Sequence, residues 1–348
     1  MDGELTAPGN PIEGGFHGMN TDGTGDGGMQ ATRLSQINFC ELFLGHPVLG
    51  DRLSDSQTSQ IRPLPQNDEL LQDVEQLKSA CREAARVAPA ASELRVIHDD
   101  VAYRVFNMVT LRGAVTVLRR VASAIGMLAD LGVPPACTGP MLAKDLSGLF
   151  LISGQMKSGK TTTACTMVKE RLGLYGGIAV TAEDPTELPL EGKHGDGICY
   201  QTVVPCDGGG FPEAFARITR WGPNIILLGE IRDRDTAVEA LQASITGRLV
   251  ISTVRSESLV KAVMKLHALA NEKIVSGGAQ LLSDGLIGVL HQRLVGSLKP
   301  RLEADFLYLR DAPSARRHIL EGKYDLLANE LERQTTTLFA AAPHRRKT

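Results

Sequence analysis

Apolar and polar residues alternate along the chain in two different rhythms. Residues 68–87 carry apolar side chains three and four positions apart, the spacing that predicts an amphipathic helix. This predicted helical face consists of Leu70, Leu71, Val74, Leu77 and Cys81. The segment Tyr103 to Arg120 instead predicts two strands that turn near Gly113, and residues 37–45 predict a further strand. Together these elements predict a small α+β domain.

Beyond a stretch rich in proline and glycine, short aliphatic runs alternate with helical segments. The predicted order is strand 149–153, helix 161–172, strand 178–181, strand 224–230, helix 236–246 and strand 249–254. Strands that alternate with helices predict a parallel sheet, whose ligands bind at the carboxyl ends of the strands. From Ser258 onward we expect mostly helix, including the apolar run "GLIGVLHQRLV" at 285–295.

These rhythms predict four segments. Residues 1–30 are polar and poor in aliphatic side chains, so we expect a disordered tail. Residues 31–132 form the α+β domain, with a linker to about 140. Residues 141–335 form the α/β domain with C-terminal helices, and 336–348 a solvated tail.

Composition and charge argue against several classes of protein. The formal charge of −3 over 348 residues disfavours direct, sequence-independent binding of nucleic acid. The six cysteines include no Cys-x-x-Cys pair, which argues against a zinc ribbon or a disulfide scaffold and favours reduced thiols. We find no apolar run long enough to span a bilayer and no signal pattern, so we expect a cytoplasmic protein.

The sequence "GQMKSGKT", Gly154 to Thr161, is typical of a phosphate-binding loop between a strand and a helix. Its glycines allow backbone N–H groups to converge on a phosphate, and the helix N-terminus favours negative charge. Lys160 would reach the β and γ phosphates, and the Thr161 hydroxyl would hold Mg²⁺. The predicted nucleotide-binding residues are Gly154, Ser158, Gly159, Lys160, Thr161 and Thr162. The alternative is a glycine-rich turn without a ligand.

Two strand ends carry acids on the predicted edge of the phosphate loop. The strand "NIILLGE" ends in Glu230, and "IAVTAEDPTE" ends in Glu183 and Asp184. Hydrolysis of a nucleoside triphosphate requires a group that orients water and an acid that supports the metal ion. Two acidic strand ends therefore favour a hydrolase over a passive binder, although acids also cap strands for structural reasons.

Five motifs together resemble the traffic ATPases of type II and type IV secretion, the group that includes PilT-type pilus retraction motors. They are "YRVFNMVTLRGAVTVLR", "GQMKSGKTTT", "TAEDPTE", "FARITRWGPNIILLGEIRD" and "TGRLVISTVRS", over roughly residues 95–300. The resemblance implies a RecA-like P-loop core below a PAS-like N-terminal domain, assembled as a homo-hexamer. It also implies inner-membrane platform or secretion-complex partners, so the protein would be peripheral at the inner membrane.

The resemblance also assigns roles to residues. Glu183 looks like the general base and Glu230 like the Walker B acid, which holds Mg²⁺ through water. Arginines of the N-terminal domain would reach the nucleotide at or near a subunit boundary, unless they are solvated strand residues; they are Arg104, Arg112 and Arg119. The arginines Arg217, Arg220 and Arg232 match further family positions with less defined roles.

The sequence departs from the family at two histidine positions, which are here Arg248 and Arg255. Both are candidate phosphate sensors, because a permanent cation suits a γ-phosphate. Lys157 stands where glycine is frequent, and we interpret it as a solvated loop residue.

The leading hypothesis is a Mg²⁺-dependent ATPase whose hexameric ring powers a type IV pilus or a type II or type IV secretion or conjugation machine. The alternative is a nucleotide-binding ring subunit that hydrolyses ATP weakly and acts as an assembly platform. A small-molecule P-loop kinase is a third hypothesis. The missing tetracysteine site and the short N-terminal domain favour PilT-type or type IVB-secretion-type motors. Retraction, assembly, protein secretion and DNA transfer all remain open.

Overall fold

The computed structural model describes most of the chain. The described residues are 31–37, 39–54, 61–87, 93–121, 124–184, 186–204, 210–274, 277–296 and 301–340. The expected tail 1–30, residues 341–348 of the expected tail 336–348, and Cys206 lie outside the described residues. Cysteines in the described ranges are free thiols.

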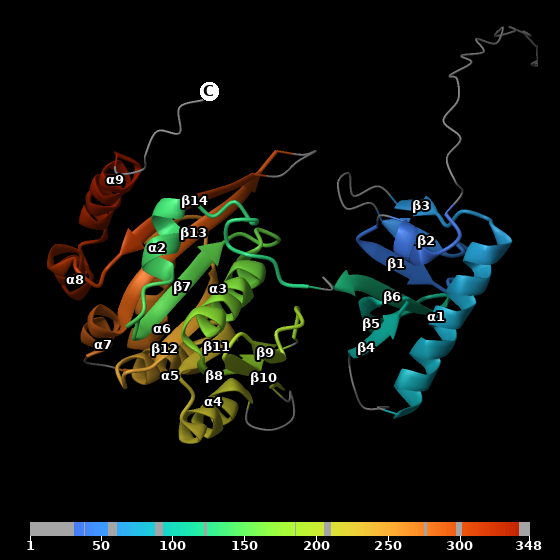
Figure 1. Ribbon diagram of the computed structural model, residues 1–348, viewed down its shortest axis with the longest axis horizontal. Helices are drawn as coiled ribbons and strands as arrows, with labels where there is room; N and C mark the ends of the chain where they lie inside the picture. Colours follow the sequence, from blue (N-terminus) through green and yellow to red (C-terminus); the bar gives the residue numbers. More distant parts are fainter. Residues whose placement is uncertain are drawn as a thin grey trace, which may run out of the picture.

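The N-terminal lobe is an antiparallel sheet with one long helix (Figure 1). The strand order is β3-β2-β1-β6-β5-β4. The strands are β1 (Glu41–Leu44), β2 (Arg52–Ser54), β3 (Ile61–Pro63), β4 (Leu94–His98), β5 (Val101–Thr110) and β6 (Gly113–Val121). The short 3-10 helix η1 (Leu34–Gln36) precedes them. The predicted hairpin is confirmed, because β5 and β6 pair from Ala102↔Val121 to Thr110↔Gly113.

Helix α1 (Asp68–Val87) covers this sheet and confirms the predicted amphipathic helix. Leu70, Val74, Leu77 and Cys81 are buried against sheet residues such as Leu42 and Leu118. Asp68 and Glu69 lie in the first turn, where negative charge stabilises a helix. One apolar face therefore fixes the helix on the sheet.

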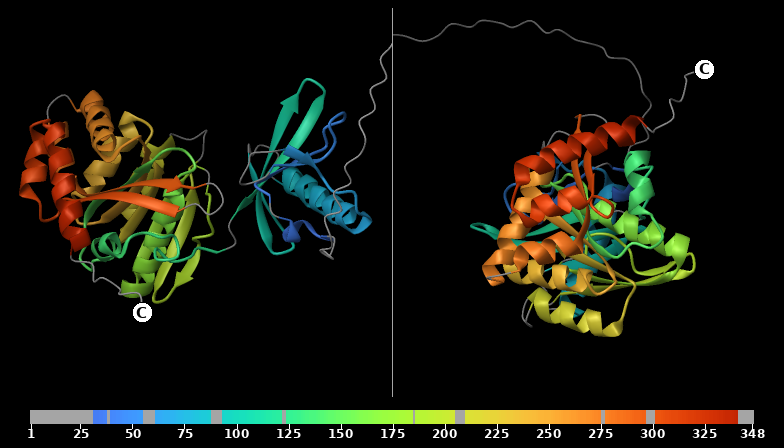
Figure 2. Two further views of the ribbon diagram at one scale, coloured as in Figure 1. Left: turned by 90° about the horizontal axis from the view of Figure 1, so that it is seen from above. Right: turned by 90° about the vertical axis from the view of Figure 1, so that its left-hand side faces the viewer.

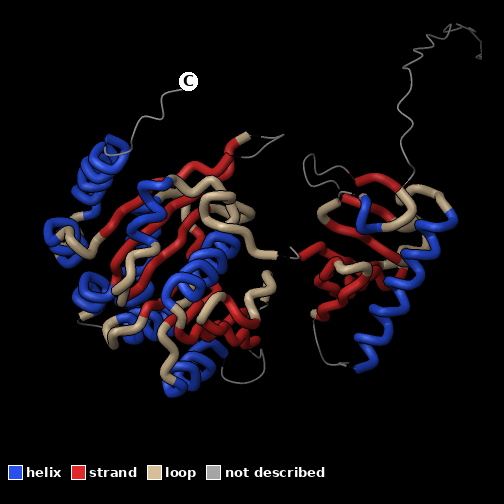
Figure 3. The backbone as a smooth tube through the Cα atoms, in the orientation of Figure 1, coloured by secondary structure: helices blue, strands red, loops and turns tan. Residues whose placement is uncertain are grey.

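The larger lobe is built on a second sheet, whose strands are red in Figure 3. Its strand order is β14-β13-β7-β12-β11-β8-β10-β9. Its strands are β7 (Gly148–Gly154), β8 (Gly177–Glu183), β9 (Gly192–His194), β10 (Gly197–Val203), β11 (Ile225–Glu230), β12 (Leu249–Arg255), β13 (Leu286–Val295) and β14 (Arg301–Tyr308). The six inner strands are parallel, and β9 and β14 pair antiparallel at the two edges.

Helices cover both faces of the larger sheet (Figures 1 and 2). One face packs against α2 (Pro135–Met141) and α3 (Lys160–Tyr175). The opposite face packs against α4 (Gly210–Trp221), α5 (Arg234–Ser244), α6 (Leu259–Lys273), α7 (Gly278–Gly285), α8 (Pro313–Leu320) and α9 (Tyr324–Ala340). Because the central strands are buried on both sides, they are mostly apolar, as in other parallel sheets. None of the helices in the described ranges is long and apolar enough to cross a lipid bilayer.

Several expectations for the C-terminal part were wrong. The run at 285–295 is mostly strand β13, and β14 follows it, where we expected helices. A continuous apolar run does not distinguish a buried strand from a buried helix, because both faces of either are covered. Here Gly288 lies against the Phe150 ring, where a Cβ atom would come 2.7 Å from Cε2. Helix α9 extends to Ala340, past the start of the expected solvated tail at 336, whose limit stays a prediction.

Strands β9 and β10 and helix α4 were also not predicted. The domain limits 31–132 and 141–335 stay predictions.

We predict that Leu77→Ala lowers the free energy of unfolding by about 2–5 kcal/mol, because the substitution leaves a cavity under α1. Chemical denaturation of the full chain would measure the change. Gln76→Ala, at an exposed position of the same helix, serves as the control and should have little effect. Equal effects of the two substitutions would contradict the assigned face of α1.

Candidate active site

The phosphate loop joins β7 to α3, as predicted. Gly154 ends the strand with φ +154°, and a Cβ atom there would lie 2.3 Å from the Gln292 carbonyl oxygen. Gly159 caps α3 in the left-handed region, with φ +84°. Both positions therefore favour glycine. Lys157 is also left-handed, at φ +63°, and its side chain is exposed.

Strand β13 contacts the phosphate loop. The Gln292 side-chain amide is fully buried and donates to the Ser158 carbonyl oxygen at 2.6 Å. The neighbouring His291 Nδ1 lies 3.0 Å from the Ser153 hydroxyl, at the end of β7. We did not predict either residue, because the apolar run at 285–295 indicated a helix. The two polar residues inside an apolar run were the available signal.

Lys160 begins α3 and is almost fully buried. Its ammonium donates to the Gln155 carbonyl oxygen at 2.6 Å, inside its own loop. Burial lowers the pKa of Lys160, and the Glu230 carboxylate opposes this shift. A phosphate bound in the loop would give the ammonium a charged partner in place of a neutral carbonyl.

A cleft of about 550 Å³ opens between the loop and the N-terminal lobe. Four of the predicted nucleotide-binding residues line the cleft: Gly159, Lys160, Thr161 and Thr162. The other two, Gly154 and Ser158, do not line it. The wall contains seven Lys or Arg and four Asp or Glu side chains, so it suits a polyanion better than a neutral ligand.

The two predicted acids reach this cleft from different strands. Glu183 ends β8, and Glu230 ends β11. Because β7, β8, β11 and β12 are parallel, their carboxyl ends meet at one edge of the sheet. Lys160 and both acids therefore line the same cleft, as the spacing predicts.

The two acids have different surroundings. Glu183 is 2% exposed, and burial raises its pKa, while hydrogen bonds from Gln201 and Thr181 act in the opposite direction. The Gln201 amide lies 3.0 Å from Glu183 Oε1. Glu230 instead forms ion pairs with Arg232 at 2.9 Å and with Arg255 at 2.8 Å. A buried acid with a raised pKa suits proton transfer, whereas Glu230 is held by two arginines.

The structure separates the two candidate phosphate sensors. Arg255 ends β12 beside Gly154 and lines the cleft. Arg248 precedes the amino end of the same strand and bonds the Thr246 hydroxyl and the Thr219 carbonyl oxygen. A seven-residue strand spans about 20 Å. Arg248 therefore cannot contact a phosphate in this chain's loop, and this expectation is corrected.

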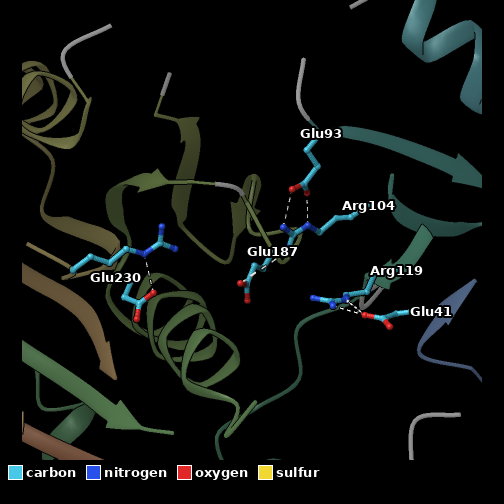
Figure 4. A network of polar contacts seen from close by, with 7 residues as sticks. Glu41, Glu93, Arg104, Arg119, Glu187 and Glu230 are labelled. Atoms are coloured by element: carbon cyan, nitrogen blue, oxygen red, sulfur yellow. Dashed lines mark hydrogen bonds and ion pairs between the residues drawn. The ribbon is translucent and has the colours of Figure 1, made fainter. Parts of the chain in front are cut away.

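The N-terminal lobe brings two of the three predicted arginines to the cleft (Figure 4). Arg104 forms a two-pronged ion pair with Glu93, with one contact of 2.8 Å, and lies 4.0 Å from Glu187 of the larger lobe. Arg119 bonds Glu41, with Nε at 3.2 Å. Figure 4 shows each arginine facing its carboxylate partner, so both guanidinium groups are already paired.

Two further arginines of the N-terminal lobe do not fit the predicted set. Arg112 lies at the exposed tip of the β5–β6 hairpin, outside the cleft lining. Arg120 also lines the cleft, which we did not predict. Its guanidinium donates to the Ser35 and Ile37 carbonyl oxygens and lies over the Phe39 ring, so its role is structural.

The cleft fits Mg²⁺ only together with a phosphate ligand. Within the described ranges, no group of three or more His, Cys, Asp or Glu side chains could hold a metal ion. The Thr161 hydroxyl and the Glu230 carboxylate are hard oxygen donors in one cleft. Mg²⁺ commonly takes one or two protein oxygens and completes its octahedron with phosphate and water.

Residues 78–333 match the family model described as "Type II/IV secretion system protein". This chain belongs to that family. The resemblance seen in the sequence is therefore confirmed at the level of the family.

Similar proteins are named for different secretion and pilus systems. The chain is 35% identical over 209 residues to the type II secretion system protein HxcR of Pseudomonas aeruginosa, covering 59% of this chain and 42% of that protein. It is 35% identical over 201 residues to the type IV pilus assembly ATPase PilB of Thermus thermophilus, covering 56% and 21%. These matches span less than half of each relative's length.

Two solved structures share the fold over most of their length. A crystal structure of the pilus retraction motor PilT with bound ADP has a TM-score of 0.70 at 22% identity, covering 85% of this chain and 86% of that chain. The Legionella pneumophila ATPase DotB has a TM-score of 0.65 at 16% identity, covering 87% and 88%. The predicted fold, a RecA-like core with a smaller N-terminal α+β, PAS-like domain, is confirmed.

We predict that Gln292→Leu lowers the affinity for MgATP about tenfold, because it leaves the Ser158 carbonyl oxygen without its buried donor. Titration with a fluorescent ATP analogue would measure the affinity. Leu294→Ala, at an exposed site on the same strand, is the control. Unchanged affinity in a folded Gln292→Leu protein would show that β13 does not support the loop.

Proposed function

We propose that this chain is a Mg²⁺-dependent ATPase and a subunit of a hexameric motor. The motor would power a type IV pilus or a type II or type IV secretion or conjugation machine. One observation carries the proposal: Lys160, Glu183 and Glu230 line one cleft, although the first begins helix α3 and the acids end strands β8 and β11. A passive phosphate site would need only the loop.

The loop performs the first task, which is to bind the triphosphate. Gly159 and the first residues of α3 line the cleft, and Thr161 and Thr162 lie in its first turn, where backbone N–H groups and the helix dipole favour a phosphate. Lys160 exchanges the Gln155 carbonyl oxygen for a phosphate oxygen. The Gln292 amide keeps the loop in place during this exchange.

Glu183 performs the second task, which is to accept the proton of the attacking water. Burial raises the pKa of this carboxyl group, which makes the ionised form a stronger base. The Thr161 hydroxyl and Glu230, the latter through water, would hold Mg²⁺, which neutralises charge on the transferred phosphoryl group. Arg255 could leave its ion pair with Glu230 and pair with the γ-phosphate instead.

The arginines of the N-terminal lobe perform the third task, which is to couple chemistry to movement. Arg104 and Arg119 are paired with Glu93 and Glu41, so a bound nucleotide must compete for them. Exchange of these partners would move one lobe against the other. In a closed head-to-tail ring, the exposed Arg112 tip would lie at or near a subunit boundary. We propose the domain limits 31–132 and 141–335 for the two moving units.

The type of machine and its place in the cell rest on the relatives. Similar proteins named for type II secretion and for pilus assembly both occur, which supports the class of motor without separating its members. We propose a cytoplasmic protein that is peripheral at the inner membrane through platform or secretion-complex partners, without direct binding to nucleic acid.

One observation favours the alternative, a ring subunit that binds nucleotide but hydrolyses it weakly. Arg232 and Arg255 both neutralise Glu230 in this structure. If these pairs persist when nucleotide binds, the acid is withheld from the metal ion. The subunit would then act mainly as an assembly platform.

We predict that the purified ring hydrolyses ATP with Mg²⁺ and that Lys160→Ala abolishes turnover, because the loop loses its only buried cation among the described loop residues. A phosphate-release assay would measure turnover, and native mass spectrometry would verify the hexamer. Lys193→Ala, at an exposed lysine of β9, should retain wild-type activity. Tight binding without turnover in the wild-type ring would favour the platform.

We predict that Glu183→Gln lowers turnover at least 100-fold and leaves MgATP affinity nearly unchanged. A general base acts in its ionised form, and burial raises the pKa of Glu183. Turnover of the wild type should therefore fall as the pH decreases, at a higher pH than an ordinary glutamate would require. Measurement of kcat against pH tests this, with exposed Glu213→Gln as the control. Near-normal turnover in Glu183→Gln would exclude Glu183 as the base.

A further inference from the structure

We propose that Gln201 is the positioning residue of the active site: its amide holds the Glu183 carboxylate in the orientation and charge state that activate water. The proposal rests on the proposed ATP hydrolysis. Gln201 lies on β10, the strand next to β8 on the side away from β11.

The sheet register places the two side chains together. Gln201 pairs with Thr181 in the parallel ladder, and Glu183 follows Thr181 by two residues. Side chains two residues apart on a strand point to the same face, so Gln201 and Glu183 are diagonal neighbours. The amide nitrogen of Gln201 lies 3.0 Å from Glu183 Oε1.

Every hydrogen-bonding position of the Gln201 amide is used. Its nitrogen also donates to the Leu188 carbonyl oxygen at 3.0 Å. Its oxygen accepts from the backbone N–H groups of Leu190 and Glu191, each at 2.7 Å. A flipped amide would place its NH₂ group against two N–H donors and its oxygen against a carboxylate and a carbonyl. The surroundings therefore fix the amide with its donor toward Glu183.

The same four contacts link the acid to the loop that follows it. Leu188 lines the cleft beside Glu183, and Leu190 and Glu191 continue the loop toward β9. One neutral side chain thus fixes both the carboxylate and the wall next to it. It does so without adding charge, and its donated hydrogen bond stabilises the ionised acid.

Other ionisable groups also surround Glu183. They are Glu187 in the following loop, Cys165 on α3, Cys199 on β10, and Lys160, Asp184, Glu230 and Arg104 around the cleft. Burial raises the pKa of Cys199 to about 12 and that of Cys165 well above its usual value, so both thiols are neutral. The Glu187 carboxylate repels the ionised acid, whereas its backbone N–H and the Thr181 hydroxyl donate to it with smaller effects than Gln201. Gln201 is thus a neutral donor that favours the charged form.

Two substitutions separate positioning from a general structural role. Gln201→Leu removes all four hydrogen bonds. Gln201→Glu has nearly the same shape and keeps the acceptor for Leu190 and Glu191, but it places a negative charge beside Glu183. The matched control is Thr202→Val, on the same strand, which removes a hydroxyl that bonds the Thr181 carbonyl oxygen.

In both Gln201 variants we expect kcat at neutral pH to fall about 10-fold to 100-fold. The KM for MgATP should change little, because the phosphate loop is untouched. The acidic limb of the kcat profile should move to higher pH, since the ionised acid loses a donor or gains a like charge. Thr202→Val should leave the limb in place. A uniform loss of kcat with an unmoved limb in both variants would overturn the proposal.

A direct titration separates this inference from the proposed function. Glutamate labelled with ¹³C at the carboxyl carbon reports each ionisation by NMR, and Glu183→Gln identifies the Glu183 signal. The signal should titrate at higher pH in Gln201→Leu than in the wild type. If the wild-type ring hydrolyses no ATP, the proposed function fails. The titration would still show whether Gln201 stabilises the ionised form of Glu183. An unchanged Glu183 titration would overturn the role of Gln201.

Discussion

The parallel register of β7, β8, β11 and β12 is the constraint on which the candidate site depends. It brings the phosphate loop, both acids and Arg255 to one edge of the sheet, although they are distributed over about 100 residues of sequence. The strands are buried on both faces, so the register is fixed by packing on two sides. A slip of one residue would turn each terminal side chain to the opposite face. The chemistry therefore relies on the core as much as on the motifs.

Several arginines at this edge form ion pairs with carboxylates of the chain. Arg104 and Arg119 are held by carboxylates of their own lobe, and Glu230 is held by Arg232 and Arg255. The cations of the cleft wall are thus held in ion pairs whose carboxylate partners a ligand would have to replace. A triphosphate offers more negative charge than a single carboxylate. Exchange of partners is then the physical basis on which binding could drive movement between the lobes.

Neutral amides hold the charged parts in place. Gln292 supports the phosphate loop from β13, and Gln201 contacts Glu183 from β10. An amide carries two donors and two acceptor lone pairs, so it can bond backbone and carboxylate groups at once without changing the net charge. Both residues lie on strands that flank the motif-bearing strands. The flanking strands therefore contribute directly to the geometry of the cleft.

Local sequence determined the elements with their own period or motif: α1, the β5–β6 hairpin, the phosphate loop, and the acids that end β8 and β11. These follow from spacing and residue type alone, because each depends on neighbours within a few residues. Tertiary structure decided the rest. It made 286–295 a strand, placed Arg255 in the cleft and Arg248 at the opposite strand end, and brought Gln292 to Ser158 across 134 positions. Such contacts join segments far apart in the chain, and no local pattern records which distant partner a buried polar side chain will meet.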